Sequence, residues 1–159
     1  MFAVSALRIR PATVADADDL VRIINAAFIV ERVFIGRDRT NAEDVRSMFG
    51  RGAFLAGEDE AGAIVACVYV EQQGDRGYFG LLSVDPAHHG QGHGRRMIDH
   101  VEAHVRAHGC RALDIRVVNL RTELPPIYRK LGFVETGIEP FEDADLLLPA
   151  HFIRMSKRL

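Results

Sequence analysis

The spacing of hydrophobic residues at the start of the chain predicts a strand followed by a helix. Residues 6–13 have the composition of a short strand. Apolar residues then recur at helical spacing over residues 14–28. Thr13 and Asp16 form a capping box at the start of this run, so we place the beginning of the first helix there.

The hydrophobic pattern then becomes irregular before it turns strand-like. Residues 29–40 stay apolar without a clear period, and Asn41 is a suitable N-cap for a second helix over residues 41–49. Three strand-like runs follow, joined by short segments rich in Gly and Asp that are typical of hairpin turns. We predict that these runs are antiparallel strands, over residues 53–59, 63–73 and 76–84.

The C-terminal half alternates helices and strands. An apolar stripe that includes Met97 and Val105 predicts a helix over residues 94–108, and Gly109 stands where a left-handed C-cap residue is expected. A buried strand, a short helix opened by prolines and two further strands follow, over residues 112–118, 123–132, 133–141 and 151–157.

The element order is therefore βααβββαβαββ. This order predicts an α/β (α+β) fold: a mixed, mostly antiparallel sheet of about seven strands flanked by about four helices, in a single domain over residues 1–159.

Composition narrows the classes of partner. A net charge of −2 and a pI near 6.4 give no general attraction for nucleic acid or an anionic membrane, so we expect neither as a partner. Cys67 and Cys110 are far apart without CxxC spacing, which argues against disulfides or a thiolate zinc site and favours the cytoplasm. The opening residues are too short an apolar stretch for a signal peptide, and no segment has the length of a membrane span.

The stretch "DPAHHGQGHGRRM", residues 85–97, lies between a predicted strand and a predicted helix. Glycines there permit positive φ and close approach, and the start of a helix presents unpaired N–H groups to a phosphate. Arg95 occupies the position where the dinucleotide fingerprint GxGxxG needs its third glycine, and the P-loop pattern has no match. The stretch favours a pyrophosphate site of a different kind.

Residues 84–94, "VDPAHHGQGHG", resemble the pyrophosphate loop V-x-P-x-x-(Q/R)-G-x-G-x-G/A of the GNAT family of acyl-CoA-dependent N-acyltransferases, with His89 at the Gln/Arg position. Residues 127–133, "IYRKLGF", are similar to the family's (L/F)YxKxGF segment. Asn119 ends the preceding strand, as an asparagine does in the family, although it stands nine residues before Tyr128 rather than about seven.

The resemblance implies direct transfer of an acetyl group from acetyl-CoA to a primary amine. It implies that the strand ending at Val84 splays from its neighbour, so that free backbone amides hold pantetheine and polarise the thioester. Tyr128 is then the general acid for the leaving thiolate. Glu71 is the leading candidate for the base, ahead of Glu31 and His88. The residues expected to bind the coenzyme are Leu82, Ser83, Val84, His89, Gly90, Gln91, Gly92, His93, Gly94, Arg95, Asn119 and Tyr128.

Two other classes of function compete with this interpretation. The same fold can serve as a non-catalytic sensor that binds acyl-CoA. The histidines of the loop, and His100, His104 and His108 at i, i+4 and i+8, suggest a metal-binding protein. The helical histidines flank the apolar stripe, however, so we favour boundary packing and predict no metal.

The acceptor stays open at this stage: a small amine, an amino acid, an antibiotic, a peptide N-terminus and a protein lysine all qualify. Residues 28–52, which cover the substrate in the family, combine apolar and acidic side chains. We interpret Arg37–Arg39 as a solvated loop, with a handle for acidic groups of the substrate as the alternative. A homodimer is equally open.

Overall fold

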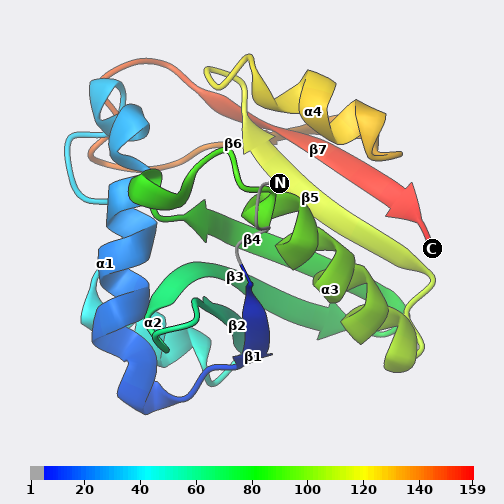
Figure 1. Ribbon diagram of the computed structural model, residues 1–159. Coiled ribbons are helices and arrows are strands. Elements are labelled where there is room, and N and C mark those ends of the chain that lie inside the picture. Colours follow the sequence, from blue (N-terminus) through cyan, green and yellow to red (C-terminus); the bar gives the residue numbers. More distant parts are fainter. Residues whose placement is uncertain (1–5) are drawn as a thin grey trace.

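The computed structural model describes residues 6–159 and contains one seven-stranded sheet of order β1-β2-β3-β4-β5-β7-β6 (Figure 1). The strands are β1 (Arg8–Pro11), β2 (Ala53–Glu58), β3 (Ile64–Gln73), β4 (Arg76–Val84), β5 (Ala112–Val118), β6 (Val134–Pro140) and β7 (His151–Arg158). Only β4 and β5 pair in parallel; every other neighbouring pair is antiparallel. This sheet confirms the predicted fold class and element order.

Helices cover both faces of the sheet. They are α1 (Ala17–Ala27), α2 (Ala42–Met48), α3 (His93–Ala107) and α4 (Leu124–Lys130), with 3-10 turns at Val14–Asp16, Ile29–Val33 and Pro86–His88. Helix α1 packs on one face, where Leu20 and Ile24 join a cluster with Phe54 of β2. Helix α3 packs on the other face, where Met97 and Val101 belong to the larger core cluster.

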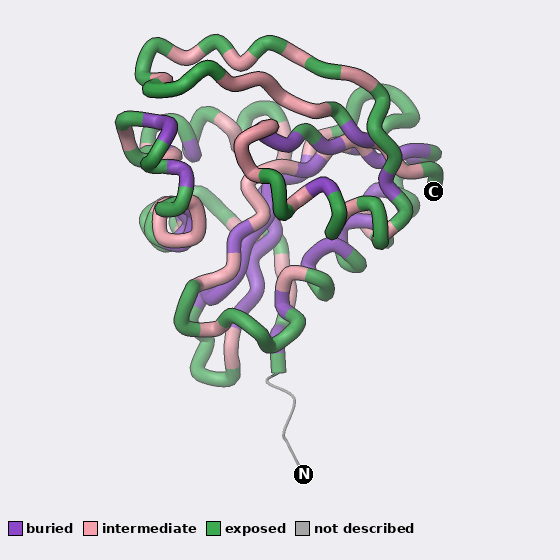
Figure 2. The backbone as a smooth tube through the Cα atoms, turned by 90° about the horizontal axis from the view of Figure 1, so that it is seen from above, coloured by how far each residue is buried: buried purple, intermediate pink, exposed green. Residues whose placement is uncertain are grey.

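Strand β3 explains why two cores form. Its run from Ile64 to Val70 is buried throughout, and alternate side chains point to opposite faces of the sheet. Cys67 and Tyr69 belong to the core under α1, whereas Val68 and Val70 belong to the core under α3. Buried positions accordingly concentrate along the central strands (Figure 2).

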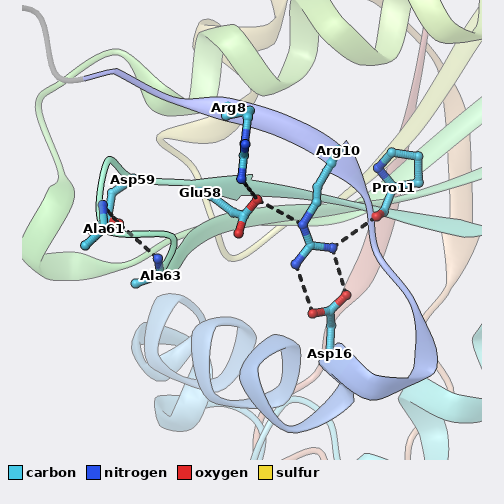
Figure 3. A network of polar contacts seen from close by, with 8 residues as sticks. All are labelled: Arg8, Arg10, Pro11, Asp16, Glu58, Asp59, Ala61 and Ala63. Carbon is cyan, nitrogen blue, oxygen red and sulfur yellow. Dashed lines mark hydrogen bonds and ion pairs between the residues drawn. The ribbon is translucent and has the colours of Figure 1, made fainter.

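A charged network at the edge of the sheet holds the turn that leads into α1 (Figure 3). Asp16 accepts a hydrogen bond from the Thr13 backbone N–H at 2.8 Å, as the capping box predicts. Arg10 donates to both Asp16 oxygens, at 2.9 and 3.0 Å, and to Glu58 at 3.0 Å. These bonds lower the pKa of Asp16 and tie β1, β2 and the first helical turn together.

Local details follow the sequence with small shifts. Asn41 caps α2, accepting from the Asp44 N–H at 2.9 Å, and Gly109 has the expected positive φ of 82° after α3. The irregular segment contains the Ile29–Val33 turn and an isolated bridge from Ile35 to Leu146.

No helix among residues 6–159 is long and apolar enough to cross a membrane. Residues 1–5, which belong to the opening stretch weighed above as a signal peptide, lie outside the described part of the chain.

Candidate coenzyme and acceptor site

Strand β4 is paired on both sides for only part of its length. Arg76, Gly77 and Tyr78 pair with β5, and the segment from Phe79 to Val84 has no partner there. On the other side, Cys67 pairs with Ser83 and Tyr69 with Gly80, so two β4 residues oppose the single residue Val68.

This extra residue is a β-bulge, and Leu81 adopts a φ of 55° within it. A bulge bends and twists its strand, which accounts for the divergence of β4 from β5 visible in Figure 1. The divergence leaves a cleft of about 190 Å³, lined by both strands and by α4. The predicted splay is therefore present in the structure.

The loop after β4 is held open by its own contacts. Asp85 caps the Pro86–His88 turn by accepting from the Ala87 N–H at 2.9 Å, and His89 Nε2 lies 3.1 Å from the Val84 carbonyl. Gly90 and Gly92 have φ of 78° and 77°, and no atom lies within 4 Å of the point where either would carry a Cβ. The glycines therefore leave a cradle that a bound group can enter.

Backbone N–H groups are the donors of this cradle. In the described part of the chain, the first hydrogen bond of α3 runs from the Arg96 N–H to the Gly92 carbonyl, at 3.1 Å. The preceding amides, from His93 to Arg95, have no backbone acceptor, as expected for the first turn of a helix. Together with the positive end of the helix dipole, they fit a diphosphate.

The side chains of the loop are largely engaged elsewhere. Arg95 pairs with Asp99 at 3.0 Å, and Arg96 donates to the Leu7 carbonyl at 2.9 Å. His93 is 2% exposed, and neither ring nitrogen has a hydrogen-bond partner within residues 6–159. Burial lowers the pKa of His93, and Arg96 and His88 add to this effect. Binding of an anion here rests on the main chain.

Tyr128 lines the cleft from α4. Its ring packs against Phe79 and Phe133, with centroids 6.2 and 5.6 Å away. Burial raises the pKa of Tyr128 to about 12, so the phenol is protonated at neutral pH and has a proton to donate.

Other residues expected at the site have structural contacts. Asn119 Oδ1 accepts from the His151 N–H at 2.8 Å, which joins the end of β5 to the start of β7, and Asn119 does not line the cleft. Ser83 is buried and donates to the Leu81 carbonyl within the bulge. Direct contact of these two side chains with the coenzyme stays a prediction.

A second cavity, which we call the acceptor hollow, adjoins the cleft. It measures about 460 Å³ and is lined by parts of α2, β3 and β4 and by the segment 37–40. Glu71 lies in it and accepts a hydrogen bond from the Tyr69 hydroxyl at 2.8 Å. Burial and Glu71 raise the pKa of Tyr69 to about 12, which keeps that hydroxyl a donor.

The other two candidates for the base have different surroundings. Glu31 lines the cleft, but it is buried in an ion pair with Arg121 at 2.9 Å, and burial raises its pKa. His88 lies in the glycine loop, its ring 6.3 Å from that of His93. Of the three, only Glu71 faces the acceptor hollow.

Arg116 and Tyr78 also line both cavities, and the sequence interpretation did not single them out. For Arg116 the sequence does contain a signal. Asp114 and Arg116 are polar residues at alternate positions of the apolar run 112–118, a pattern that predicts that one face of this strand is uncovered.

The histidines of α3 show contacts with each other and with the backbone. The rings of His104 and His108 lie 4.5 Å apart, and His108 Nδ1 is 2.8 Å from the His104 carbonyl. A search of residues 6–159 finds no group of three or more His, Cys, Asp or Glu side chains that could hold a metal ion.

The sequence of the chain is similar to those of known proteins over the region that contains this site. The sequence model of the acetyltransferase (GNAT) domain matches residues 50–135, which include β4, the glycine loop and Tyr128. The chain is 31% identical over 142 residues to mycothiol acetyltransferase of Propionibacterium freudenreichii, covering 81% of this chain and 45% of that protein. It is 29% identical over 147 residues to glucosamine 6-phosphate N-acetyltransferase 1 of Oryza sativa, covering 84% and 85%.

Solved structures show the same fold. One neighbour from Salmonella typhimurium, described as an acetyltransferase and solved with its cofactor acetyl-CoA, superimposes with a TM-score of 0.73 at 20% identity, covering 97% of this chain and 94% of that one. The chain spans less than half the length of the mycothiol acetyltransferase that it matches. The acetyltransferase (GNAT) domain model, in turn, matches more than half of this chain. The chain belongs to the GNAT acetyltransferase family.

Proposed function

We propose that the protein is an N-acetyltransferase that moves the acetyl group of acetyl-CoA directly onto a primary amine. The observation that carries this proposal is the segment of β4 from Phe79 to Val84, which does not pair with β5. It leads into a loop whose amides are free at the start of α3. A thioester lying along β4 and a diphosphate at the loop would satisfy the two sets of donors at once.

The chemistry balances with one acid and one base. At pH 7 the acceptor is an ammonium ion, which first loses one proton to become the free amine. The amine nitrogen then forms a bond to the thioester carbon, the carbon–sulfur bond breaks, the nitrogen loses a second proton and the sulfur gains one, so that one proton is released to solvent overall. An alkyl amine has a pKa of about 10.4, so removing its proton at pH 7 costs about 4.6 kcal/mol. A base in the acceptor hollow lowers this barrier.

Glu71 is the base that we propose. It faces the hollow, and its hydrogen bond from Tyr69 fixes the carboxylate in one orientation. A carboxylate in this position can accept the proton of the amine directly or through one water.

Tyr128 is the acid that we propose for the departing thiolate. Its half-buried ring lines the cleft, and a pKa raised to about 12 keeps the phenol protonated, so it can donate a hydrogen bond to the sulfur as negative charge develops there. The Phe79 and Phe133 rings hold it in position.

The acceptor itself is a proposal at the level of an amine, either a small molecule or a peptide. Two relatives are named for mycothiol and for glucosamine 6-phosphate, so glucosamine 6-phosphate is the first acceptor to test. We also propose a cytoplasmic location, which two free, buried cysteines support.

The test is a thiol-release assay with acetyl-CoA against a panel of amines, run beside thermal-shift titration with CoA. The proposal expects thiol release with at least one amine and stabilisation by about 2.7 kcal/mol at 100 times the dissociation constant. Stabilisation by CoA with no thiol release from any amine would support the sensor instead. Absence of both responses would reject coenzyme binding altogether.

A further inference from the structure

Two arginines stand at the border between the cleft and the acceptor hollow. The two cavities share five lining residues: Arg39, Tyr78, Gly80, Leu81 and Arg116. An amine that enters the cleft from the hollow must pass these guanidinium groups. They are therefore placed to contact the rest of the acceptor molecule.

The acceptor hollow has an excess of positive side chains. The lining carries four arginines and two carboxylates, namely Arg37, Arg39, Arg51, Arg116, Asp44 and Glu71. Arg37 is neutralised from outside the hollow by Asp143 and Asp145. Arg116 is likewise paired from outside the hollow, with Glu139 at 3.5 Å. Among residues 6–159, Arg39 and Arg51 are the lining arginines with no carboxylate within ion-pair distance, so a negatively charged ligand could pair with them directly.

Arg39 is the more buried of these two arginines. It is half-buried, and no carboxylate of residues 6–159 lies within ion-pair distance of its guanidinium. The guanidinium carbon lies 5.5 Å from the centre of the Phe28 ring, and burial lowers the pKa of Arg39. Glu31 and Asp143 act on this charge from beyond ion-pair distance. An anion in direct contact with the guanidinium would therefore compensate the cost of its burial better than the protein's own carboxylates do.

The backbone next to Arg39 is held rigidly. Asn25 Nδ2 donates to the Thr40 carbonyl at 3.1 Å, and Asn25 Oδ1 accepts from the Thr40 N–H at 2.9 Å. Thr40 is only 6% exposed. This paired contact with α1 fixes the segment before any ligand binds, which reduces the entropy that binding would otherwise cost.

Arg116 supplies a second set of donors on the opposite wall. Its Nε lies 3.4 Å from the Tyr78 hydroxyl, and its closest carboxylate contact, to Glu139, is 3.5 Å. The guanidinium lies 4.6 Å from the centre of the Phe152 ring. Since a guanidinium has five N–H donors, Arg116 keeps donors for a ligand.

We infer that the acceptor is an amine that also carries an oxyanion, a carboxylate or a phosphate monoester, which Arg39 binds together with Arg116. This inference rests on the proposed acetyltransferase function and adds the class of substrate. Guanidinium groups bind both oxyanions with paired hydrogen bonds, so the two sources share one chemistry.

The experiment compares acceptors with and without the anion. Glucosamine 6-phosphate and glucosamine form the phosphate pair, and methionine and methioninamide form the carboxylate pair. Each is assayed for thiol release from acetyl-CoA and, separately, for binding to the full chain in the presence of CoA by calorimetry. The binding measurement gives an answer even for an amine that is not turned over.

Three variants accompany the wild type. Arg39→Gln removes the charge, Arg39→Lys keeps it without the paired donors, and Arg106→Gln removes a charge from an exposed position of α3 as the matched control. Stabilisation by CoA in each variant shows that the fold and the coenzyme site are intact.

We expect at least one anionic amine to exceed its neutral counterpart about tenfold or more in kcat/KM or affinity. Arg39→Gln should reduce that preference by about 10- to 100-fold, chiefly through KM, with Arg39→Lys intermediate and Arg106→Gln unchanged. Equal treatment of both members of each pair, or an unaltered preference in Arg39→Gln, would overturn the inference. If neutral amines are acetylated as efficiently as anionic ones, this inference is wrong, but the proposed acetyltransferase function is still supported.

Discussion

We propose that the two sides of the cleft bind by different means. On the proposed coenzyme side, the free donors are main-chain amides from Gly90 to Arg95, and Gly90 and Gly92 place no side chain there. On the acceptor side, the polar groups belong to side chains, among them Arg39, Glu71 and Arg116, which come from separate segments. Backbone recognition leaves a fixed glycine spacing in the sequence, whereas side-chain recognition depends on how distant elements pack.

The largest effect that we expect concerns the chemical step, where the two sides meet. Tyr128→Phe should lower kcat by about 10²- to 10⁴-fold, because the leaving thiolate loses its proton donor. CoA affinity should stay the same. Since the pKa of Tyr128 is raised to about 12, wild-type turnover should show no decline between pH 8 and 10 that depends on this residue.

Tyr78→Phe is the matched control, since it removes the other phenol that lines the cleft. It should keep kcat within about tenfold of wild type. Equal losses in the two variants would remove the special role of Tyr128.

The second effect concerns the acceptor side. Glu71→Gln should lower kcat by about 10²-fold at pH 7 and make the rate rise with pH, because only the unprotonated fraction of the amine then reacts. CoA binding should not change. If Glu31→Gln shows this pH profile and Glu71→Gln does not, the proton goes to Glu31.

The third effect concerns the coenzyme side and tests recognition by the backbone. Gly92→Ala should weaken CoA binding about tenfold or more, because a methyl group enters the cradle and the residue must hold a φ of 77°. Gly109→Ala meets the same strain at a φ of 82° at the far end of α3. The temperature of thermal unfolding should fall by a similar amount in both variants, whereas calorimetry should show weaker CoA binding in Gly92→Ala alone. Equal CoA affinity in the two variants would show that the close approach at Gly92 is unnecessary.

The smallest effect concerns stability beneath the same loop. The pKa of buried His93 is lowered, so the unfolded chain binds its proton more readily and the free energy of unfolding falls as pH drops below about 6.5. His93→Phe removes a buried ring whose nitrogens have no partner, and we expect stability within about 1 kcal/mol of wild type at pH 7.5. Denaturant titrations should show that the free energy of unfolding falls less between pH 7.5 and pH 5.5 in the variant than in the wild type. If it falls equally in both, His93 does not titrate with folding.

The fold was predictable because its signals are local. Helical spacing, the capping residues Thr13 and Asn41 and the glycine after α3 fixed the element order, which the structure confirms. The segment 29–40 was not predictable, because its 3-10 turn and its bridge to Leu146 depend on contacts from distant parts of the chain.

The site divides in the same way. Glycine spacing and the tyrosine segment identified the family, which the domain match bears out, and the coenzyme loop that they predict stays a prediction. The sequence favours a solvated loop for Arg37–Arg39, yet in the structure Arg39 lines both cavities. The segment is held there because Asn25 of α1, which is distant in the sequence, bonds to the backbone of Thr40. Nothing in the local pattern distinguishes Arg39 from its neighbour Arg37, which forms ion pairs with Asp143 and Asp145.

The most direct measurement is calorimetric titration of the full chain with CoA and, in parallel, with pantetheine, which lacks the diphosphate and the adenosine 3′-phosphate attached to it. The free amides of residues 90–95 predict saturable binding of CoA and affinity for pantetheine weaker by about 100-fold or more. Equal affinity for the two compounds, or no binding of CoA, would contradict the claim that the main chain at the start of α3 holds the coenzyme.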